Sequence, residues 1–300
     1  MKKILVTGAN SFIGQHLIPY LEISGYEVQG IIKTSTQYTF QKIDLNLIDR
    51  RPYLLGDLSD IDFINNLNYK PDSIIHLAAN RDESSGILNL IRDNVTATNN
   101  LLSYSRRIGC SQIIALSSVS VHGQISTSSL TLNSDFNNPT HYGLTKRLAE
   151  IVLLEKNMSE SIFVLRIPAV LGIGAKNHWI SKIFKNALSH SEITQYNSSN
   201  FFNNVVYIND LLEFITSLLN CGHKGNYVFP IASTIPVTIE NVISQILRLT
   251  ASKSKIINIH SKNLSFIIED NFARENFSYI SLTTSSAIER FVKDEMHLIK

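Results

Sequence analysis

Three side chains of the sequence could together move a proton during a redox reaction: Ser118, Tyr142 and Lys146. Tyr142 and Lys146 are four positions apart, so on a helix they share one face and can act at one site. A free tyrosine, with a pKa of about 10, is a poor base at neutral pH, but a neighbouring ammonium favours the phenolate and lowers that pKa. A serine hydroxyl can bind and orient the reacting oxygen. The set therefore suits hydride transfer to or from a carbinol carbon, where a side chain must take or give the hydroxyl proton.

The context of these residues decides whether the pattern is meaningful, because Tyr-x-x-x-Lys alone is common on surface helices. Ser117 and Ser118 end an apolar segment that we expect to be a strand. Side chains at the carboxyl end of a parallel strand face the ligand crevice. A second motif, near the N-terminus, predicts a binding site for a cofactor that could carry the hydride. Together they favour a catalytic interpretation.

The second motif is the stretch TGANSFIG, residues 7–14, between a predicted strand at 3–7 and a predicted helix at 12–24. Glycines allow the backbone to turn sharply and to approach a pyrophosphate with no Cβ in the way. The helix N-terminus then presents free N–H groups and a partial positive charge to the phosphates. An ordinary tight turn would look similar, but the strand–turn–helix context favours dinucleotide binding.

The end of the second strand, expected at 27–33, indicates which nicotinamide dinucleotide binds. A carboxylate there would hydrogen-bond the adenosine ribose of NAD, whereas a basic residue would accommodate the 2′-phosphate of NADP. The strand ends at Lys33 with no carboxylate, so NADP is favoured; NAD stays open, because a solvated lysine is common at a strand end. Asp57, in Gly56-Asp57-Leu58, could cap the following helix, contact the adenine amino group, or do both.

Strands and helices alternate along the first half of the chain. Besides the segments above, strand-like apolar runs are expected at 73–78, 111–117 and 162–167, and helices at 87–107 and 141–157. Such alternation predicts an α/β fold with a doubly wound parallel sheet, the Rossmann architecture. Strands without internal polar alternation fit a sheet covered on both faces.

This regularity fades towards the C-terminal part, where helices are expected at 177–189, 208–219 and 239–249 between polar stretches. We expect residues 1–171 to form a dinucleotide-binding Rossmann domain that carries the catalytic residues. Residues 172–300 are expected to form a smaller, mainly substrate-binding lobe over the carboxyl ends of the strands. Since the chain has no low-complexity linker, the sequence does not mark a sharp boundary between the two.

The overall composition narrows the class of partner. The net charge is +2 and Lys and Arg are scattered, so the basic stripe of a nucleic-acid-binding protein is missing. No run approaches the ~20 apolar residues of a membrane span. Cys110 and Cys221 are too few for a disulfide framework or a cysteine zinc site, and His76, inside an apolar strand, fits a core residue better than a metal ligand. We expect a soluble, cytoplasmic protein with a small-molecule substrate, without a nucleic-acid or membrane partner and without a metal.

Taken together, these features resemble the extended short-chain dehydrogenase/reductase superfamily, specifically the NAD-dependent epimerase/dehydratase family that acts on nucleotide sugars. The resemblance spans nearly the whole chain. TGANSFIG resembles the family's TGxxGxxG, and Tyr142 and Lys146 fall on its Tyr-x-x-x-Lys. Other similar segments are residues 56–58, 76–79, 94–102, 117–123, 166–172, 206–210 and 270–275.

The resemblance implies which residues form the site. Ser118 aligns with the catalytic Ser/Thr, so the expected catalytic residues are Ser118, Tyr142 and Lys146. Ser118 and Asn177 are expected to contact the substrate, a nucleotide sugar. The expected cofactor-binding residues are Gly8, Asn10, Ser11, Phe12, Ile13, Gly14, Lys33, Asp57, Leu58, Leu77, Ala78, Ala79, Ser117, Tyr142, Lys146 and Pro168.

Three positions depart from the family pattern. Ser11 stands where the middle glycine usually lies, and its side chain is expected to loosen cofactor binding or to shift the pyrophosphate. The arginine that many members use to bind the substrate diphosphate would fall near Asn203, so the arginine–diphosphate contact is missing. His122 stands where the family usually has a tyrosine. The resemblance further implies a homodimer through a bundle of the helices expected at 87–107 and 141–157.

Several activities share such a site. A 4,6-dehydratase uses an acid and a base beside the catalytic serine, but Val119 and Ser120 follow Ser118, so dehydration is disfavoured. A reductase releases oxidised cofactor after each turnover, whereas an epimerase keeps NAD bound and returns the hydride to the other face of the sugar. Lys33 and Ser11 favour a 4-keto-sugar reductase or dehydrogenase, with a 4-epimerase as the alternative. A non-catalytic protein that senses the cofactor is a third hypothesis, which the intact catalytic set disfavours.

Overall fold

The computed structural model describes residues 1–33, 53–155, 161–260 and 265–299. The chain divides into two compact units that interleave along the sequence. The first comprises Met1–Gly123, Phe136–Arg166 and Leu212–Phe229, and the second comprises Gln124–Asp135, Ile167–Leu211 and Pro230–Lys300. Neither unit is therefore one continuous stretch of sequence.

The first unit is built around a seven-stranded sheet in the order β12-β7-β5-β4-β1-β2-β3. Its strands are β1 (Lys3–Thr7), β2 (Glu27–Ile32), β3 (Leu54–Leu55), β4 (Ser73–His76), β5 (Gln112–Ser118), β7 (Ser161–Ile167) and β12 (Asn226–Pro230). Pairing is parallel between β1 and β2, β1 and β4, β2 and β3, and β4 and β5. The strand order reverses at β1, the point at which doubly wound sheets bind their ligands. The predicted α/β doubly wound fold is confirmed.

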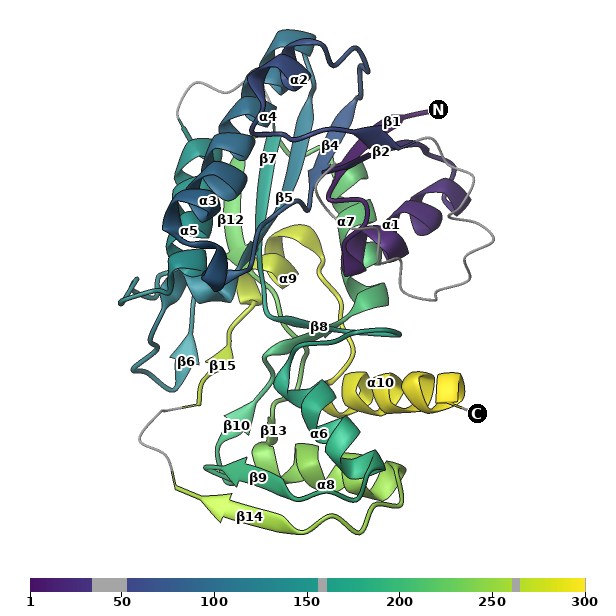
Figure 1. Cartoon of the computed structure of the whole chain (residues 1–300), viewed down its shortest axis with the longest axis vertical. Helices are drawn as coiled ribbons and strands as arrows, with labels where there is room; N and C mark the ends of the chain where they lie inside the picture. The colour runs from purple at the N-terminus through teal and green to yellow at the C-terminus, as the bar shows by residue number, and fades with distance from the viewer. Residues whose placement is uncertain (34–52, 156–160, 261–264, 300) are drawn as a thin grey trace. The chain divides into compact units, whose positions relative to one another are not determined.

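Helices cover both faces of this sheet. They are α1 (Phe12–Ile23), α2 (Ile61–Asn65), α3 (Ile87–Ile91), α4 (Ala97–Ile108), α5 (His141–Leu153) and α7 (Ile208–Asn220). α1 and α7 lie on one face, and α3, α4 and α5 are grouped on the other (Figure 1). Local signals set the ends: Thr140 caps α5 by accepting a hydrogen bond from Gly143 N, and α4 ends at Gly109 in the left-handed conformation.

The helix predicted at 87–107 is not a single α-helix. Between α3 and α4 the chain forms a π-helical segment, η2 (Arg92–Thr96). A π turn adds one residue to the helical repeat and so changes which side chains share a face, and such turns are frequent at functional sites. Sequence periodicity could not reveal it. The helix predicted at 141–157 ends at Leu153, and residues 156 and 157 lie outside the described residues.

The second unit has no large sheet among its described residues. Its short strands pair two by two: β8 (Ala169–Leu171) with β11 (Val205–Tyr207), β9 (Ile193–Tyr196) with β14 (Ile256–Ile259), β10 (Phe201–Phe202) with β13 (Val237–Thr238), and β6 (Ser129–Leu130) with β15 (Ile267–Ile268). Its helices are α6 (Trp179–Leu188), α8 (Ile239–Leu249), α9 (Asn271–Phe277) and α10 (Thr284–Ile299).

His76 is a buried residue of the first unit's core, at the end of β4. Thr98 Oγ1 donates to Asn94 O, so it accepts from His76 Nε2 at 3.0 Å, and His76 Nδ1 then accepts from Thr7 Oγ1 at 2.7 Å. Burial, together with the charge of Lys146, lowers the pKa of His76 to about 3. The imidazole is therefore neutral and fully hydrogen-bonded, as expected of a core histidine.

Replacing His76 with Asn should flatten the acid dependence of stability. The folded-state pKa, about 3, lies below the ordinary value of 6.5, so the unfolded chain binds the proton more readily. The stabilisation from neutral His76 is complete above pH 6.5 and is lost as the pH falls towards 3. Between these values the unfolding free energy of the wild type should fall more steeply than that of His76→Asn, by up to about 1.4 kcal/mol per pH unit. Urea titrations at several pH values measure both slopes, and His223→Asn, at an exposed position, is the control. Parallel slopes for wild type and His76→Asn would contradict the assignment.

Candidate active site

The glycine turn after β1 is tightly packed. Gly8 has a φ of +67°, and a Cβ there would lie 2.8 Å from the backbone N of Ala78. A Cβ at Gly14 would lie 2.6 Å from Gly8 O. Any larger residue at either position would displace backbone. The turn is therefore a cradle of bare backbone, as close approach to a pyrophosphate requires.

Ser11 fits this turn without strain. Its φ of −68° is ordinary for any residue, and its Oγ accepts a hydrogen bond from Gly14 N at 3.1 Å as the N-cap of α1. The expectation that the serine loosens the turn is therefore not supported. Its side chain stabilises the start of the helix instead.

A cavity of about 380 Å³ opens beside the turn. Predicted cofactor residues that line it are Gly8, Asn10, Ser11, Lys33, Asp57, Leu58, Leu77, Ala78 and Ala79. Residues that line it but were not predicted are Ile31, Gly56, Asn80, Arg92, Asp93 and Ala97. Of the other candidates, Phe12, Ile13 and Gly14 form the first turn of α1. The cavity and the glycine cradle fit a dinucleotide.

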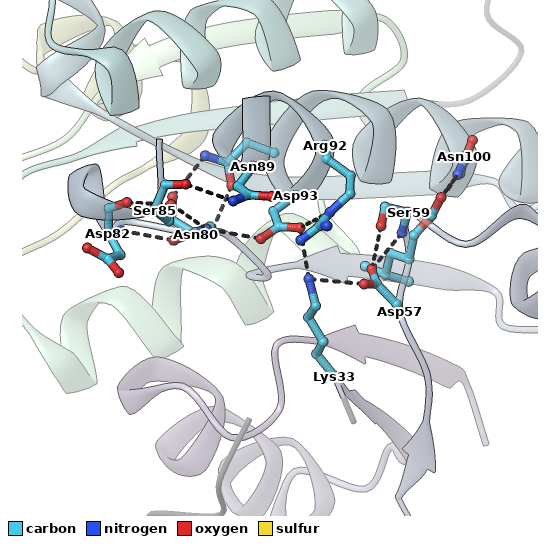
Figure 2. A network of polar contacts seen from close by, with 12 residues as sticks. Lys33, Asp57, Ser59, Asn80, Asp82, Ser85, Asn89, Arg92, Asp93 and Asn100 are labelled. Atoms are coloured by element: carbon cyan, nitrogen blue, oxygen red, sulfur yellow. Dashed lines mark hydrogen bonds and ion pairs between the residues drawn. The ribbon is translucent and has the colours of Figure 1, made fainter. Parts of the chain in front are cut away.

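Lys33 is paired rather than solvated. Its Nζ lies 3.0 Å from Asp57 Oδ2 and 2.8 Å from Asp93 Oδ1 (Figure 2). Asp57 Oδ1 accepts hydrogen bonds from the N and Oγ of Ser59, whereas the cap of α2 is Asp60. Asp57 is thus a wall of the cavity and not a helix cap, and the reading of Lys33 as an open cation is wrong.

The catalytic set predicted from sequence comes together in the first unit. Ser118 ends β5, and Tyr142 and Lys146 lie one turn apart on α5. Ser118 lies close enough to the Tyr142 phenol to act on its pKa, and its Oγ accepts hydrogen bonds from Ser120 N at 3.2 Å and Ser120 Oγ at 2.8 Å. Lys146 is buried, and its Nζ donates to Leu116 O at 2.7 Å. A carbonyl of the serine's own strand thereby fixes the ammonium.

Burial controls the ionisation of this set. It raises the pKa of Tyr142 above its usual value of 10, while the charge of Arg81 and the hydrogen bond from Ser118 oppose the rise. The Arg81 guanidinium lies 5.9 Å from the ring centre. Burial lowers the pKa of Lys146 to about 8, against the opposing charge of Glu150. The phenol pKa is therefore raised on balance and not lowered as expected; Arg81 and Ser118 oppose the rise, and Lys146 is not among the groups that lower it.

A buried ion pair between Glu150 and Arg166 lies beside the catalytic set. Glu150 Oε2 lies 2.9 Å from Arg166 Nη2, and both side chains are almost fully buried. Ser117 Oγ donates to Glu150 Oε1 at 2.6 Å, so this serine, predicted to bind cofactor, uses its hydroxyl in the core. Arg166 Nη1 also approaches His122 Nε2 at 3.1 Å. Because arginine only donates, that nitrogen is the acceptor and His122 is a neutral core residue.

Other predicted residues lie in the second unit. Pro168 directly precedes β8, and Asn177, with a φ of +66°, precedes the residue that caps α6. The Asn203 amide donates to Ser233 O and Ile268 O and accepts from Ile268 N. At the position where the family resemblance led us to look for a diphosphate-binding arginine, the Asn203 side chain therefore joins backbone segments.

Sequence reasoning missed part of the cavity wall for two reasons. Asn80 directly follows the predicted strand-end segment 76–79, so the rule that strand ends line the crevice could have included it. Arg92 and Asp93 gave no signal, because only the π-helical turn of η2 places both consecutive side chains on the cavity.

The model of the NAD dependent epimerase/dehydratase family matches residues 4–231. The chain belongs to this family. It is similar to UDP-glucose 4-epimerase of Vibrio cholerae, with 27% identity over 261 residues, covering 82% of this chain and 75% of that protein. It is also similar to dTDP-4-dehydro-6-deoxy-D-allose reductase of a Streptomyces species, with 24% identity over 239 residues, covering 74% and 73%. Among solved structures, UDP-glucuronic acid 4-epimerase of Bacillus cereus in complex with NAD shares the fold, with a TM-score of 0.82, 21% identity and coverage of 99% and 100%.

Membership of the epimerase/dehydratase family confirms the predicted resemblance and the nicotinamide dinucleotide cofactor. The protein is an enzyme of this NAD-dependent type. Within the described ranges, no group of three or more His, Cys, Asp or Glu side chains could hold a metal ion. No helix in the part of the chain that the structure describes is long and apolar enough to cross a membrane.

Gly8→Ala and Gly25→Ala form a matched pair that tests the cradle in this family member. Both glycines have positive φ, +67° and +86°, but a Cβ at Gly25 would meet nothing within 4 Å. Gly25→Ala should lower the unfolding free energy by roughly 1–2 kcal/mol, the usual strain of a left-handed alanine, and keep NAD binding. Gly8→Ala should lose the rise in Tm that NAD causes in the wild type. Thermal unfolding with and without NAD measures both effects. If NAD raised the Tm of Gly8→Ala as much as that of the wild type, the turn would not be the pyrophosphate site.

Proposed function

We propose that the protein is a nucleotide-sugar 4-epimerase that keeps NAD bound between turnovers. The observation that carries the proposal is the Tyr142 phenol, which lies beside Ser118 with the buried Lys146 ammonium one helical turn away. These groups share a unit with the glycine cradle. The name of the Vibrio cholerae relative supports the same activity.

Each side chain has a defined part in this reaction. Tyr142 takes the hydroxyl proton when the carbinol is oxidised and returns it when the ketone is reduced. Ser118 donates a hydrogen bond to the reacting oxygen. Lys146, protonated at neutral pH with a pKa of about 8, would hold the nicotinamide ribose, and the charge of Arg81 favours the phenolate of Tyr142. The nicotinamide, when bound, accepts and returns the hydride.

An epimerase is preferred to a reductase because the two features that favoured NADPH consumption have another explanation. Lys33 is neutralised by Asp57 and Asp93, and Ser11 caps a helix in an unstrained turn. A 4-keto-sugar reductase remains the second candidate, supported by the name of the Streptomyces relative. The same proton relay would serve it, with dinucleotide exchanged at each turnover.

The substrate proposal is a nucleotide sugar whose diphosphate is not bound by residue 203. The Asn203 amide already serves three backbone groups. Asn177 is the residue of the second unit that we propose to contact the sugar. Its left-handed backbone holds it just before the cap of α6, at His178.

The activity is tested by incubating purified protein with UDP-, dTDP-, GDP- and CDP-sugars, without added dinucleotide, and following epimers by NMR. Interconversion is expected, with NAD released on denaturation. Tyr142→Phe should reduce turnover by about 10²- to 10⁴-fold, the usual contribution of a proton-transfer group, and keep the bound dinucleotide. Tyr227→Phe, whose hydroxyl donates to Lys224 O, is the matched control. Turnover only with added NADH or NADPH and a 4-keto sugar would replace the epimerase by the reductase.

We also propose a homodimer through α3 and α5. Large apolar side chains are exposed on these helices: Leu88 is 79% exposed, Leu144 41% and Ile151 50%. Leu144 and Ile151 are two turns apart and share a face of α5. Large apolar side chains exposed on neighbouring helices are typical of an interface when they form one patch.

Ile151→Asp should convert the dimer to a monomer, because it places a carboxylate in an apolar contact. Ile23→Asp, on α1, replaces a side chain that is 86% exposed and should leave the dimer intact. Light scattering at micromolar concentration measures both variants, and a monomeric wild type would remove the proposal.

A further inference from the structure

Three charged side chains from separate segments meet where β2 ends. Lys33 follows β2, Asp57 follows β3, and Asp93 belongs to the π-helical segment η2 (Figure 2). Lys33 Nζ lies 3.0 Å from Asp57 Oδ2 and 2.8 Å from Asp93 Oδ1. All three side chains line the cavity. The lysine therefore bridges two carboxylates at the place where this fold binds the adenosine ribose.

Both carboxylates stay ionised. Asp93 is the less exposed, at 13% against 29% for Asp57. Burial alone would raise the pKa of Asp93, but hydrogen bonds from Lys33, Arg92 and Asn80 outweigh it and lower the pKa. Burial is likewise outweighed at Asp57, mainly by the hydrogen bonds from Ser59, and its pKa is lowered too. The charge of Lys33 is thus fully compensated.

This arrangement opposes a 2′-phosphate. Such a group carries about −1.5 to −2 charge near neutral pH. To reach Lys33 it would have to lie within a few ångströms of Asp57 and Asp93, or displace Lys33 from them, which would leave Asp57 without its cation and Asp93 with Arg92 alone. A ribose 2′-hydroxyl is neutral and can donate a hydrogen bond to a carboxylate, so it meets neither penalty.

We propose that Asp93, acting through Lys33, makes this site select NAD over NADP. The inference rests on the proposed function only in requiring that the cavity hold a nicotinamide dinucleotide. Asp93 is a positioning residue. It keeps Lys33 in an ion pair, so that the lysine is not available as a cation for the 2′-phosphate. A basic residue at the end of β2 would otherwise indicate NADP.

The test measures binding directly, with cofactor-stripped protein and isothermal titration of NAD, NADP, AMP and 2′,5′-ADP. The last two differ at the 2′-phosphate and report on the adenosine side alone. Wild type should bind NAD and AMP at least about tenfold more tightly than their 2′-phosphorylated counterparts, equivalent to one strong charge contact. Equal or tighter binding of NADP and 2′,5′-ADP would overturn the proposal.

Asp93→Asn keeps the shape of the side chain and removes one of the two carboxylates that pair with Lys33, while Asp57 stays in place. It should tighten NADP and 2′,5′-ADP by about tenfold and change NAD by less than about threefold. Asp93→Glu should restore the wild-type preference. Asp62→Asn, which removes the same charge from an exposed position on α2, should change neither affinity.

Lys33→Met separates the lysine's role from a general charge effect. In the Asp93→Asn background it should abolish the gain in NADP affinity; a gain that persists would show that Asp93 does not act through Lys33. In the wild-type background it should not weaken NADP more than NAD, and a selective loss of NADP would overturn the proposal even if Asp93→Asn failed to fold. Tighter NADP binding in wild type would leave the proposed redox function standing, whereas a protein that binds neither dinucleotide would overturn both.

Discussion

A single buried amide, that of Asn94, ties the cofactor cavity to the catalytic helix. Its Oδ1 accepts the N–H of Asn80, and its Nδ2 donates to Asn80 O and to Thr145 Oγ1. An unsatisfied buried polar group costs about 1–3 kcal/mol, so these bonds constrain one another. These hydrogen bonds hold the loop after β4, the π-helical segment η2 and α5 in fixed positions relative to one another. The positions of the ribose-side charges and of the proton relay both depend on it.

Charge in the first unit is arranged differently at the two ends of the site. At the catalytic end, the Glu150 carboxylate pairs with Arg166 and Arg147 and accepts a hydrogen bond from Ser117. It therefore makes no direct ion pair with Lys146. Lys146 donates a hydrogen bond to the carbonyl of Leu116 and keeps its charge at neutral pH. At the ribose end, Lys33 is closed between two carboxylates. The two lysines thus differ in their partners, a backbone carbonyl for Lys146 and two carboxylates for Lys33.

Most of the site residues proposed from the sequence rest on local signals. The glycine turn, the strand-end serine and the Tyr-x-x-x-Lys spacing each involve residues close in the chain, and the parallel sheet follows from alternating elements. The role of Lys33 was not predictable, since its partners Asp57 and Asp93 are 24 and 60 residues away and one depends on a π turn. Ser11 was misread because its cap bond depends on backbone angles that composition does not show.

The interleaving of the two units limits how such an enzyme can change its specificity. β12, which lies beside β7 at the edge of the sheet, enters the chain only after a long segment of the second unit. Cutting the gene at any single point before β12 would remove this strand and leave the backbone groups of β7 unpaired, an invitation to aggregation. Exchange of the whole second unit between relatives would therefore need several simultaneous splices. The second unit is more readily altered by point changes within its segments than by recombination.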